Sequence, residues 1–451
     1  MAGHTGGRPS GGRLWDKGGA IDAAMLRYTA RDDYMLDAAL LPFDLQASKA
    51  HVRGLCRVGA LEPTERDALV EGLEALERGL NDGSFGISPD DEDGHTAIEA
   101  ALVAKLGDVG KRVHLGRSRN DQVLTALRLF ERAALGDLAE RALGAGRAFL
   151  ALARSEEWTV FPGYTHLVRA VPQTVGHWAA GYAEAFTSSA KTLLEARAHL
   201  GKSPLGAAAG YGVNLPLDRE GVAHELGFED VALNPLYSQT SRGIDEVVAV
   251  TAAWHAAAFA RRFAWDVSLF STAEFGLVKL PDELTTGSSI MPNKRNPDVV
   301  ELMRGSCAVV QGALTELMGL VALPSGYQRD MQLTKAPVMR ALAEARDTLM
   351  ILPKVVSSLQ IDASRAAASV TADMLATDRA VDLARAGLPF REAYRRVAAD
   401  VGSATEPAGP AAEASVRARV SLGAPGNLAL DRLGAELDRL DALARRAPAS
   451  E

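Results

Sequence analysis

Five long segments whose apolar residues recur three or four positions apart constrain the fold of this chain more than any other feature. The first begins at Asp121, contains no proline, and places Val123, Leu127 and Phe130 on one face of a helix. The segment that begins at Gly243 is apolar on more than one face, which predicts a helix surrounded by other helices. The four segments after the first are Gln173–Leu200, Gly243–Thr272, Asp298–Leu323 and Asp330–Leu359.

The number and length of these segments predict an all-α protein with three helical domains, of which the central one is a long-helix bundle. Shorter patterns flank the bundle: Pro63 begins an amphipathic helix that ends at Gly83, and the periodic segments shorten after Gln360. Wide apolar faces on the long helices also predict that bundles associate with one another. We expect a disordered tail over residues 1–13, an N-terminal helical domain over 14–114, the bundle over 115–362 and a C-terminal helical domain over 363–451.

The charge balance excludes a general attraction for nucleic acid or for an anionic membrane. The 451 residues carry a formal net charge of −8 at pH 7, and the sequence pI is about 5.7. An anionic substrate must therefore be bound by local cations. Cys56 and Cys307 lie far apart without a CxxC pattern, which predicts neither a disulfide framework nor a zinc knuckle. This cysteine usage fits a reducing cytoplasm, where we expect the protein.

No segment has the composition of a membrane span or of a secretory signal. The longest uncharged apolar helical stretch, Val247–Ala260, is shorter than the roughly 18 residues that a span requires. The first residues, Met1–Gly12, are rich in glycine and lack the apolar core of a secretory signal. We expect neither a membrane nor nucleic acid as a partner.

The segment Gly287–Asp298 combines two serines, a lysine, an arginine, two asparagines and two prolines. Its glycine and prolines prevent regular helix, so we expect a loop that leads into a helix beginning near Pro297, with Asn296 as the N-cap. The free N–H groups of a helix start attract negative charge, and Lys294 adds a full positive charge. The segment predicts an anion site with two hydroxyl groups; a polar surface loop that ends in a helix cap is the alternative.

A second anion site is predicted by His114–Asp121, where two arginines, a serine and an asparagine come just before the start of a long helix. The alternative for this arginine-rich string is a helix cap that satisfies its own acidic neighbours.

Two further polar strings lie beside long helices. The string Gly163–Pro172 turns the chain just before the helix expected at Gln173 and presents His166, which on its own is compatible with a structural role. The string that contains Tyr327, Gln332 and Lys335 presents hydrogen-bond donors along a loop and the first turns of a helix.

Neither a nucleotide-binding P-loop nor a histidine metal site is supported by the spacing of the residues. Gly201-Lys202-Ser203 resembles the end of a P-loop, but Ala196 occupies the position of the first glycine and no strand precedes it. The histidines are scattered, with no HExxH or comparable ligand cluster. The sequence therefore predicts no nucleotide fingerprint, no metal site and no cofactor.

Together the polar strings resemble those of the fumarase/aspartase superfamily, whose members eliminate fumarate from a substituted succinate, and within it the argininosuccinate lyase family. The resemblance extends from about Leu14 to Asp400. It implies a homotetramer whose long helices form a twenty-helix core, with each active site built by three subunits. It rests on the loop Gly287–Asp298, which the superfamily shares, and on the more specific segments Asp91–Glu99, His114–Gln122, Asp373–Asp378 and Gly387–Arg391.

The resemblance implies that argininosuccinate is split into arginine and fumarate, the last step of arginine biosynthesis. A proton leaves one succinyl carbon while the guanidino nitrogen leaves its neighbour, and a doubly negative aci-carboxylate forms in between. By resemblance, Ser288 removes the proton and Lys294 supplies positive charge at that carboxylate. His166, with Glu301 as its carboxylate partner, handles the proton at the departing nitrogen. The assignment of acid and base between Ser288 and His166 stays open.

Substrate-binding positions are carried over from the family in the same way, and three departures from its pattern are visible. Asp33 stands where the family usually has a serine, and its acid can pair with the α-amino group of the substrate. Leu115 replaces a threonine, and Leu333-Thr334 replace two acidic residues, which could retune substrate affinity. Besides Asp33, the binding residues implied are Asp93, His95, Ser118, Arg119, Asn120, Thr165, Asn296, Tyr327, Gln332 and Lys335.

Two alternatives to this function remain. Another fumarate-releasing lyase of the superfamily, such as one that acts on adenylosuccinate, would share Gly287–Asp298, the signature loop. A non-enzymatic, crystallin-like descendant would share the fold, but the presence of His166, Ser288, Lys294 and Asn296 favours an enzyme.

Overall fold

The computed structural model describes residues 22–30, 33–88, 91, 93–401 and 406–445. The tail expected over residues 1–13 lies outside these residues. Among the described residues no helix is long and apolar enough to cross a membrane.

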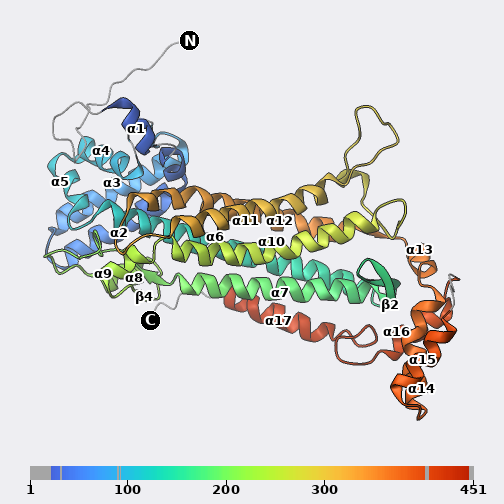
Figure 1. Cartoon of the computed structure of the whole chain (residues 1–451). Coiled ribbons are helices and arrows are strands. Elements are labelled where there is room, and N and C mark those ends of the chain that lie inside the picture. The colour runs from blue at the N-terminus through green and yellow to red at the C-terminus, as the bar shows by residue number, and fades with distance from the viewer. Residues whose placement is uncertain (1–21, 31–32, 89–90, 92, 402–405, 446–451) are drawn as a thin grey trace.

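Five long helices lie side by side along one axis and make up most of the molecule (Figure 1). Each begins and ends within three residues of a segment that the periodicity predicts, except that the last begins several residues late, after a 3₁₀ turn over Arg329–Thr334. The all-α bundle expected from the sequence is therefore confirmed. The five helices are α6 (Arg119–Ser155), α7 (Val175–His199), α10 (Ile244–Phe270), α11 (Asp298–Leu320) and α12 (Lys335–Ser358).

The bundle core combines many small alanines with a few large rings. The Phe149 ring stacks on Phe186 with centroids 5.6 Å apart and meets Phe263 edge-on at 4.9 Å. All three rings are fully buried, and alanines on α7 and α10 let the helix backbones approach closely. Burial of each such ring contributes roughly 1.5–3 kcal/mol to stability. The apolar residues on several faces of α10 thus pack against the neighbouring helices of the bundle.

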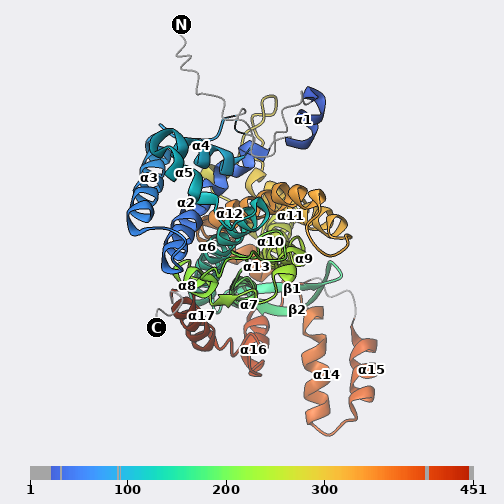
Figure 2. The ribbon, with the colours of Figure 1, turned by 90° about the vertical axis from the view of Figure 1, so that its left-hand side faces the viewer.

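A smaller helical layer covers one end of the bundle (Figures 1 and 2). It has its own core around Leu45, Leu69 and Ile98. Gly83, in the left-handed region with φ 79°, ends its second long helix as predicted. The helices of this layer are α1 (Ala23–Ala30), α2 (Asp33–Arg57), α3 (Pro63–Asp82), α4 (Gly94–Leu106) and α5 (Asp108–Lys111).

The C-terminal helices leave the opposite end of the bundle, and the last one returns to it. The pair α14 and α15 projects away from the bundle in both ribbon views (Figures 1 and 2). In contrast, α17 packs on α6 and α7, where Leu437 and Leu440 are buried. These helices are α13 (Ala363–Ala368), α14 (Ala376–Arg385), α15 (Phe390–Asp400), α16 (Pro410–Ala418) and α17 (Leu430–Ala444).

A β-hairpin lies between α6 and α7, where the sequence predicts only a turn. The antiparallel strands β1 (Val160–Thr165) and β2 (Val168–Thr174) pair around a two-residue turn. Both turn residues, His166 and Leu167, have positive φ, 56° and 60°. The strands escape detection because a proline and a glycine interrupt β1, where the register shifts at a bulge.

The remaining described elements are short and connect the long helices. They are α8 (Arg219–Glu225), α9 (Pro235–Thr240), β3 (Lys202–Ser203), β4 (Asp230–Val231), β5 (Val278–Lys279) and β6 (Gln360–Ile361), with 3₁₀ turns over Arg112–His114, Asp282–Leu284 and Ala372–Leu375.

Candidate active site

The predicted site residues lie in two groups at opposite ends of the bundle. Helix α6 runs from one end to the other with 37 residues, which at 1.5 Å per residue is about 55 Å. One small substrate cannot touch both groups of the same chain. The cavity group, beside the N-terminal layer, comprises Asp33, Asp93, His95, Ser118, Arg119, Asn120, Tyr327, Gln332 and Lys335. The loop group, at the far end, comprises Thr165, His166, Ser288, Lys294, Asn296 and Glu301.

Lys335 is the centre of the cavity group. Its side chain is 2% exposed, and its Nζ lies 2.5 Å from Asp33 Oδ1 and 2.7 Å from Asp37 Oδ1. The second oxygen of Asp37 accepts the N–H of Gly94 at 3.2 Å. Burial raises the pKa of Asp33, although Lys335 opposes that rise. Because two carboxyl groups face one ammonium group, this part of the site can accept a second cation.

The arginine-rich string begins α6 and is held by its own hydrogen bonds. Ser118 is the N-cap: its Oγ accepts the N–H of Asn120 at 3.3 Å, and its N–H donates to Asp121 Oδ1 at 2.9 Å. The guanidinium of Arg119 lies 3.3 Å from Asp93 Oδ2. Ser118 therefore acts as the cap that the alternative interpretation expects, while Arg119 and Asn120 line a cavity.

This cavity has a volume of about 90 Å³ and lies between α2, the start of α6 and the loop that precedes α12. Ligand sites for drug-sized molecules typically measure about 300–1,000 Å³, so the cavity of one chain accommodates one end of such a ligand. Its lining residues are Asp33, Asp37, Asp93, Arg119, Asn120, Val123, Arg242, Tyr327, Arg329, Gln332 and Lys335.

His95 belongs to the same end of the bundle but does not line the cavity. It is 2% exposed, and its ring lies 4.5 Å from the ring of His114. Burial, followed by the charges of His114, Arg117 and Arg119, holds the pKa of His95 well below its ordinary value. Its Nε2 is buried with no hydrogen-bond partner among the described residues. In this chain His95 therefore packs against the arginine-rich string, at His114, and not against the cavity.

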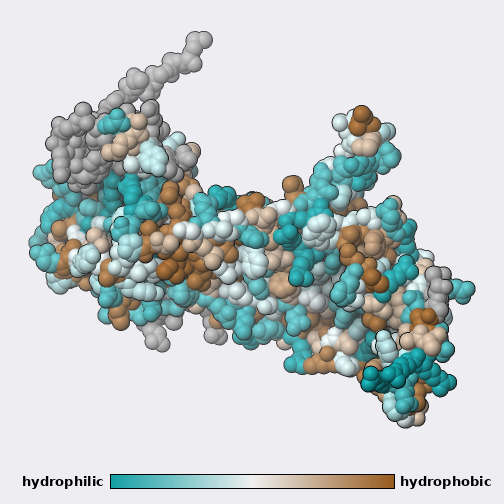
Figure 3. Space-filling view, viewed as in Figure 1, coloured by the Kyte–Doolittle hydropathy of each residue, from teal (hydrophilic) through white to brown (hydrophobic). Residues whose placement is uncertain are grey.

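The signature loop extends away from the body of the molecule, with apolar atoms near its outer end (Figure 3). Its base is closed by two hydrogen bonds between the backbones of Thr286 and Asn296, at 2.8 and 3.0 Å. Within the loop, Ser288 Oγ accepts the N–H groups of Ile290 and Met291 at 3.3 and 3.1 Å. Lys294 is exposed. The loop therefore surrounds one serine oxygen with backbone donors.

Asn296 is not the N-cap of α11, so that prediction is wrong by one residue. The helix begins at Asp298, and Pro297 occupies the cap position without a side-chain cap bond. The backbone of Asn296 is committed to the bridge with Thr286, and its side-chain amide donates to the carbonyl of Gly287 at 3.4 Å. The amide thus closes the loop instead of capping the helix.

The other members of the loop group are also exposed. Thr165 and His166 occupy the tip of the hairpin, and Leu167 beside them is 75% exposed. Glu301, in the first turn of α11, has Arg304 at 3.9 Å. No ion pair joins Glu301 to His166 within the described chain, so the pairing of these two side chains stays a prediction.

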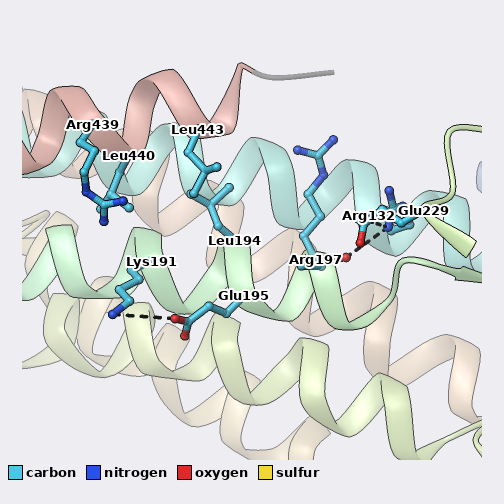
Figure 4. Close-up of a pocket in the computed structure, with 10 residues that line it drawn as sticks. Arg132, Lys191, Leu194, Glu195, Arg197, Glu229, Arg439, Leu440 and Leu443 are labelled. Atoms are coloured by element: carbon cyan, nitrogen blue, oxygen red, sulfur yellow. Dashed lines mark hydrogen bonds and ion pairs between the residues drawn. The ribbon is translucent and has the colours of Figure 1, made fainter. Parts of the chain in front are cut away.

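A larger hollow, of about 410 Å³, lies between α7 and α17 and contains none of the predicted site residues (Figure 4). Two of its charged side chains have partners: Lys191 lies 3.8 Å from Glu195, and Arg132 donates to the backbone carbonyl of Arg197 at 3.3 Å. The Nε of Arg197 is buried without a hydrogen-bond partner among the described residues. Because the hollow contains none of the motif residues, its size alone does not make it the active-site candidate.

The cavity contains two cationic residues that the polar strings did not single out. Arg242 lies one residue before the predicted helix start at Gly243, and its guanidinium is 5.5 Å from the centre of the Tyr327 ring. Arg329 lies inside the Tyr327 string and donates to the carbonyl of Thr29 at 3.2 Å. In the sequence, Arg242 could have been noticed only as an arginine just before the start of a long helix. Its burial, which the sequence does not show, distinguishes it from other arginines at helix ends.

Comparisons with known proteins agree with the fold and the motifs. A family model described as lyase matches residues 18–312. An argininosuccinate lyase of Sorangium cellulosum is 61% identical over 427 residues, covering 95% of this chain and 99% of that protein. An argininosuccinate lyase of Stenotrophomonas maltophilia is 45% identical over 428 residues, with the same coverage of both chains.

Solved structures give the same picture of the fold. EDDS lyase in complex with formate is similar with a TM-score of 0.78 and 25% identity, covering 95% of this chain and 93% of that one. A class II fumarase from Schistosoma mansoni gives a TM-score of 0.69 at 16% identity, covering 82% of this chain and 88% of that one.

Proposed function

The chain belongs to the argininosuccinate lyase family of the fumarase/aspartase superfamily, and we propose that it splits L-argininosuccinate into L-arginine and fumarate, the last step of arginine biosynthesis. The observation that carries this proposal is 61% identity to an argininosuccinate lyase over nearly the whole of both chains. The signature loop and the arginine-rich string add the chemistry that the reaction needs. An adenylosuccinate-type activity and a non-enzymatic role are not favoured by these relatives.

Ser288 is the group that we assign to removal of the succinyl proton. A neutral serine is a weak base, so its oxygen must be stabilised as an anion. The N–H groups of Ile290 and Met291 at 3.3 and 3.1 Å support this role, because donors aimed at an oxygen favour its negative form. Lys294, on the same loop, supplies positive charge for the aci-carboxylate that proton removal creates. One preorganised donor at such an oxyanion contributes roughly 3–4 kcal/mol to catalysis.

His166, with Glu301, is assigned to the proton at the departing nitrogen. The substrate guanidinium is already a cation and leaves as neutral guanidine. A free guanidine then takes up a proton readily, because its conjugate acid has a pKa above about 12. Loss of His166 should therefore reduce the rate less than loss of Ser288.

We infer that the active site is shared among chains of a homotetramer. The distance of about 55 Å along α6 supports this, since the loop group and the cavity group of one chain cannot reach one substrate. Exposed apolar side chains on the bundle offer surfaces for association. On α10, α11 and α12 these include Ile244, Trp265, Leu302, Val309, Met318 and Met350.

The cysteine usage noted above and the biosynthetic role of the reaction support a cytoplasmic location. The substrate is a small anionic molecule, and local cations such as Lys294 supply its binding charge.

Cleavage of argininosuccinate by the purified chain, followed by the ultraviolet absorbance of fumarate, tests the proposal directly. Adenylosuccinate serves as the competing substrate. We expect fumarate from argininosuccinate and none above background from adenylosuccinate. Release from adenylosuccinate alone would replace this function with the related one, and release from neither would revive the non-enzymatic alternative.

A further inference from the structure

Four arginines are buried among the described residues, and Arg242 differs from the other three. Arg117, Arg128 and Arg132 each donate at least one hydrogen bond of 2.6–2.9 Å to an oxygen of the chain. Arg242 is 2% exposed, yet it donates no hydrogen bond to any residue that the structure describes, and its Nε is enclosed without an acceptor. A buried guanidinium with unused donors is costly unless a partner outside the chain completes it.

The position of Arg242 indicates what that partner is. Its side chain lines the cavity and lies over the ring of Tyr327, with the guanidinium carbon 5.5 Å from the ring centre. A guanidinium carries five N–H donors and no acceptor, so the missing partner must supply acceptor oxygens. A carboxylate matches this planar fork with two parallel hydrogen bonds.

The other cations of the cavity are already occupied. Lys335 lies between two carboxyl groups, Arg119 faces a carboxylate at 3.3 Å, and Arg329 donates to a backbone carbonyl. Among the described residues, the cavity therefore combines one cation without an acceptor, Arg242, with a surplus carboxyl group at Lys335, that of Asp33. This pairing of charges matches the carboxylate and ammonium groups of an α-amino acid.

We propose that Arg242 binds the α-carboxylate at the arginine end of the substrate, while Asp33 accepts the α-ammonium group. This inference rests on the proposed function and assigns to its substrate a contact that none of the polar strings supplies. The cavity volume of about 90 Å³ suits one end of the ligand.

The fold compensates the charge of Arg242 without using its donors. Glu131 and Glu246 are fully buried and interact electrostatically with Arg242. Neither carboxyl oxygen of Glu131 has a donor among the described residues. Burial, followed by the charge of Glu246, raises the pKa of Glu131 well above its ordinary value. Glu246 accepts the N–H of Gly243 at 2.5 Å. Both carboxyl groups therefore interact with the charge of Arg242 without accepting its N–H groups.

The test compares two ligands that differ in one carboxylate. L-arginine and agmatine, which is arginine without its carboxylate, are titrated into the full-length chain and its Arg242→Met variant by calorimetry, with competition for the weaker ligand. We expect the Kd of arginine to rise about 10–100-fold and that of agmatine to change less than about threefold. The KM for argininosuccinate should rise by a factor similar to that for arginine, with kcat nearly unchanged, because the contact is remote from the reacting carbon.

Arg132→Met is the matched control, since Arg132 is a buried arginine whose donors go to backbone carbonyls beside the hollow of Figure 4. It should lower the melting temperature and leave both ligands and KM unaffected. If Arg242→Met does not fold, Arg242→Lys replaces it and should weaken arginine selectively by a smaller factor.

Equal weakening of arginine and agmatine, or weakening of neither, would overturn the role of Arg242. A parent chain that releases no fumarate from argininosuccinate would instead overturn the proposed function. In that case the arginine and agmatine titrations still decide whether Arg242 binds a carboxylate.

Discussion

The two ends of the bundle carry similar polar residues but differ in how deeply one chain buries them and in how many partners it gives them. In the cavity group, Lys335 is 2% exposed and lies within 2.7 Å of two carboxyl groups. In the loop group, His166 and Lys294 are exposed, and the hydrogen bonds of Ser288 go only to its own loop among the described residues. The cavity group is thus part of the folded core, whereas the loop group is presented to something outside the chain.

Because of this difference, we expect substitutions at the two ends to have different effects on catalysis and on stability. Changes in the loop group should reduce catalysis with little effect on stability, because few contacts are lost. Changes in the cavity group should affect stability as well, because buried charges lose their partners. Four substitutions probe this contrast.

The largest expected effect is on turnover by Ser288→Ala, which should lower kcat by more than about 10³-fold while the melting temperature stays close to that of the parent chain. Ser289→Ala, the neighbouring exposed hydroxyl on the same loop, is the control and should retain most of the activity. Near-full activity in Ser288→Ala, measured by fumarate absorbance, would remove Ser288 from the role of base.

The next effect is on stability at the cavity group. Lys335→Met leaves the buried carboxyl group of Asp37 and the partly buried one of Asp33 without their cation, so the free energy of unfolding should fall by roughly 3–5 kcal/mol. The control is Lys354→Met, which removes an exposed pair with Glu283 and should cost less than about 1 kcal/mol. Equal losses in denaturant titrations of the two variants would contradict the contrast between the ends.

The pH dependence of stability should also reflect His114, whose ring lies beside that of His95 in the cavity group. Burial, then Arg117 and Arg119, lowers the pKa of His114 from 6.5 to about 4. The folded state keeps this ring neutral while the unfolded state binds a proton, so its contribution is complete above pH 6.5 and is lost as the pH falls toward 4. Thermal unfolding of His114→Gln between pH 7 and pH 4.5 should show a shallower decline than the parent chain. If the melting temperatures of both proteins fall equally with pH, His114 does not contribute to the pH dependence of stability.

The smallest effect is expected at the hairpin tip of the loop group. Leu167 has φ 60°, a conformation that is unfavourable for a branched side chain and natural for glycine at the second position of such a turn. Leu167→Gly should therefore raise stability by about 0.5–1 kcal/mol. A loss of stability in denaturant titration would show that the exposed leucine has a contact, for instance with another chain.

The sequence predicted the long helices well because periodicity and helix ends are local properties. Residues close in the chain determine where α3 begins, at Pro63, and where it ends, before Gly83. They also determine the start of α11 near Pro297. The hairpin β1–β2 was missed because Pro162 and Gly163 argue against a strand until the bulge is seen.

The site was predictable in its residue types but not in its geometry. No local pattern pairs Lys335 with Asp37, which lies 298 residues earlier in the chain. The unused donors of Arg242 become visible only once burial is known. Leu115 and Leu333, two departures from the family pattern, do not line the cavity, whereas Asp33, the third, does.

Mixing two inactive variants tests most directly whether the two ends meet across chains. Asn120→Ala inactivates the cavity group and Ser288→Ala the loop group, and the two proteins are dissociated, mixed in equal amounts and reassembled. If each site takes Asn120 from one chain and Ser288 from another, random mixing leaves about one site in four intact, and about a quarter of the parent activity should return. No recovery beyond the separate variants, in mixed assemblies shown to contain both chains, would contradict a site shared between subunits.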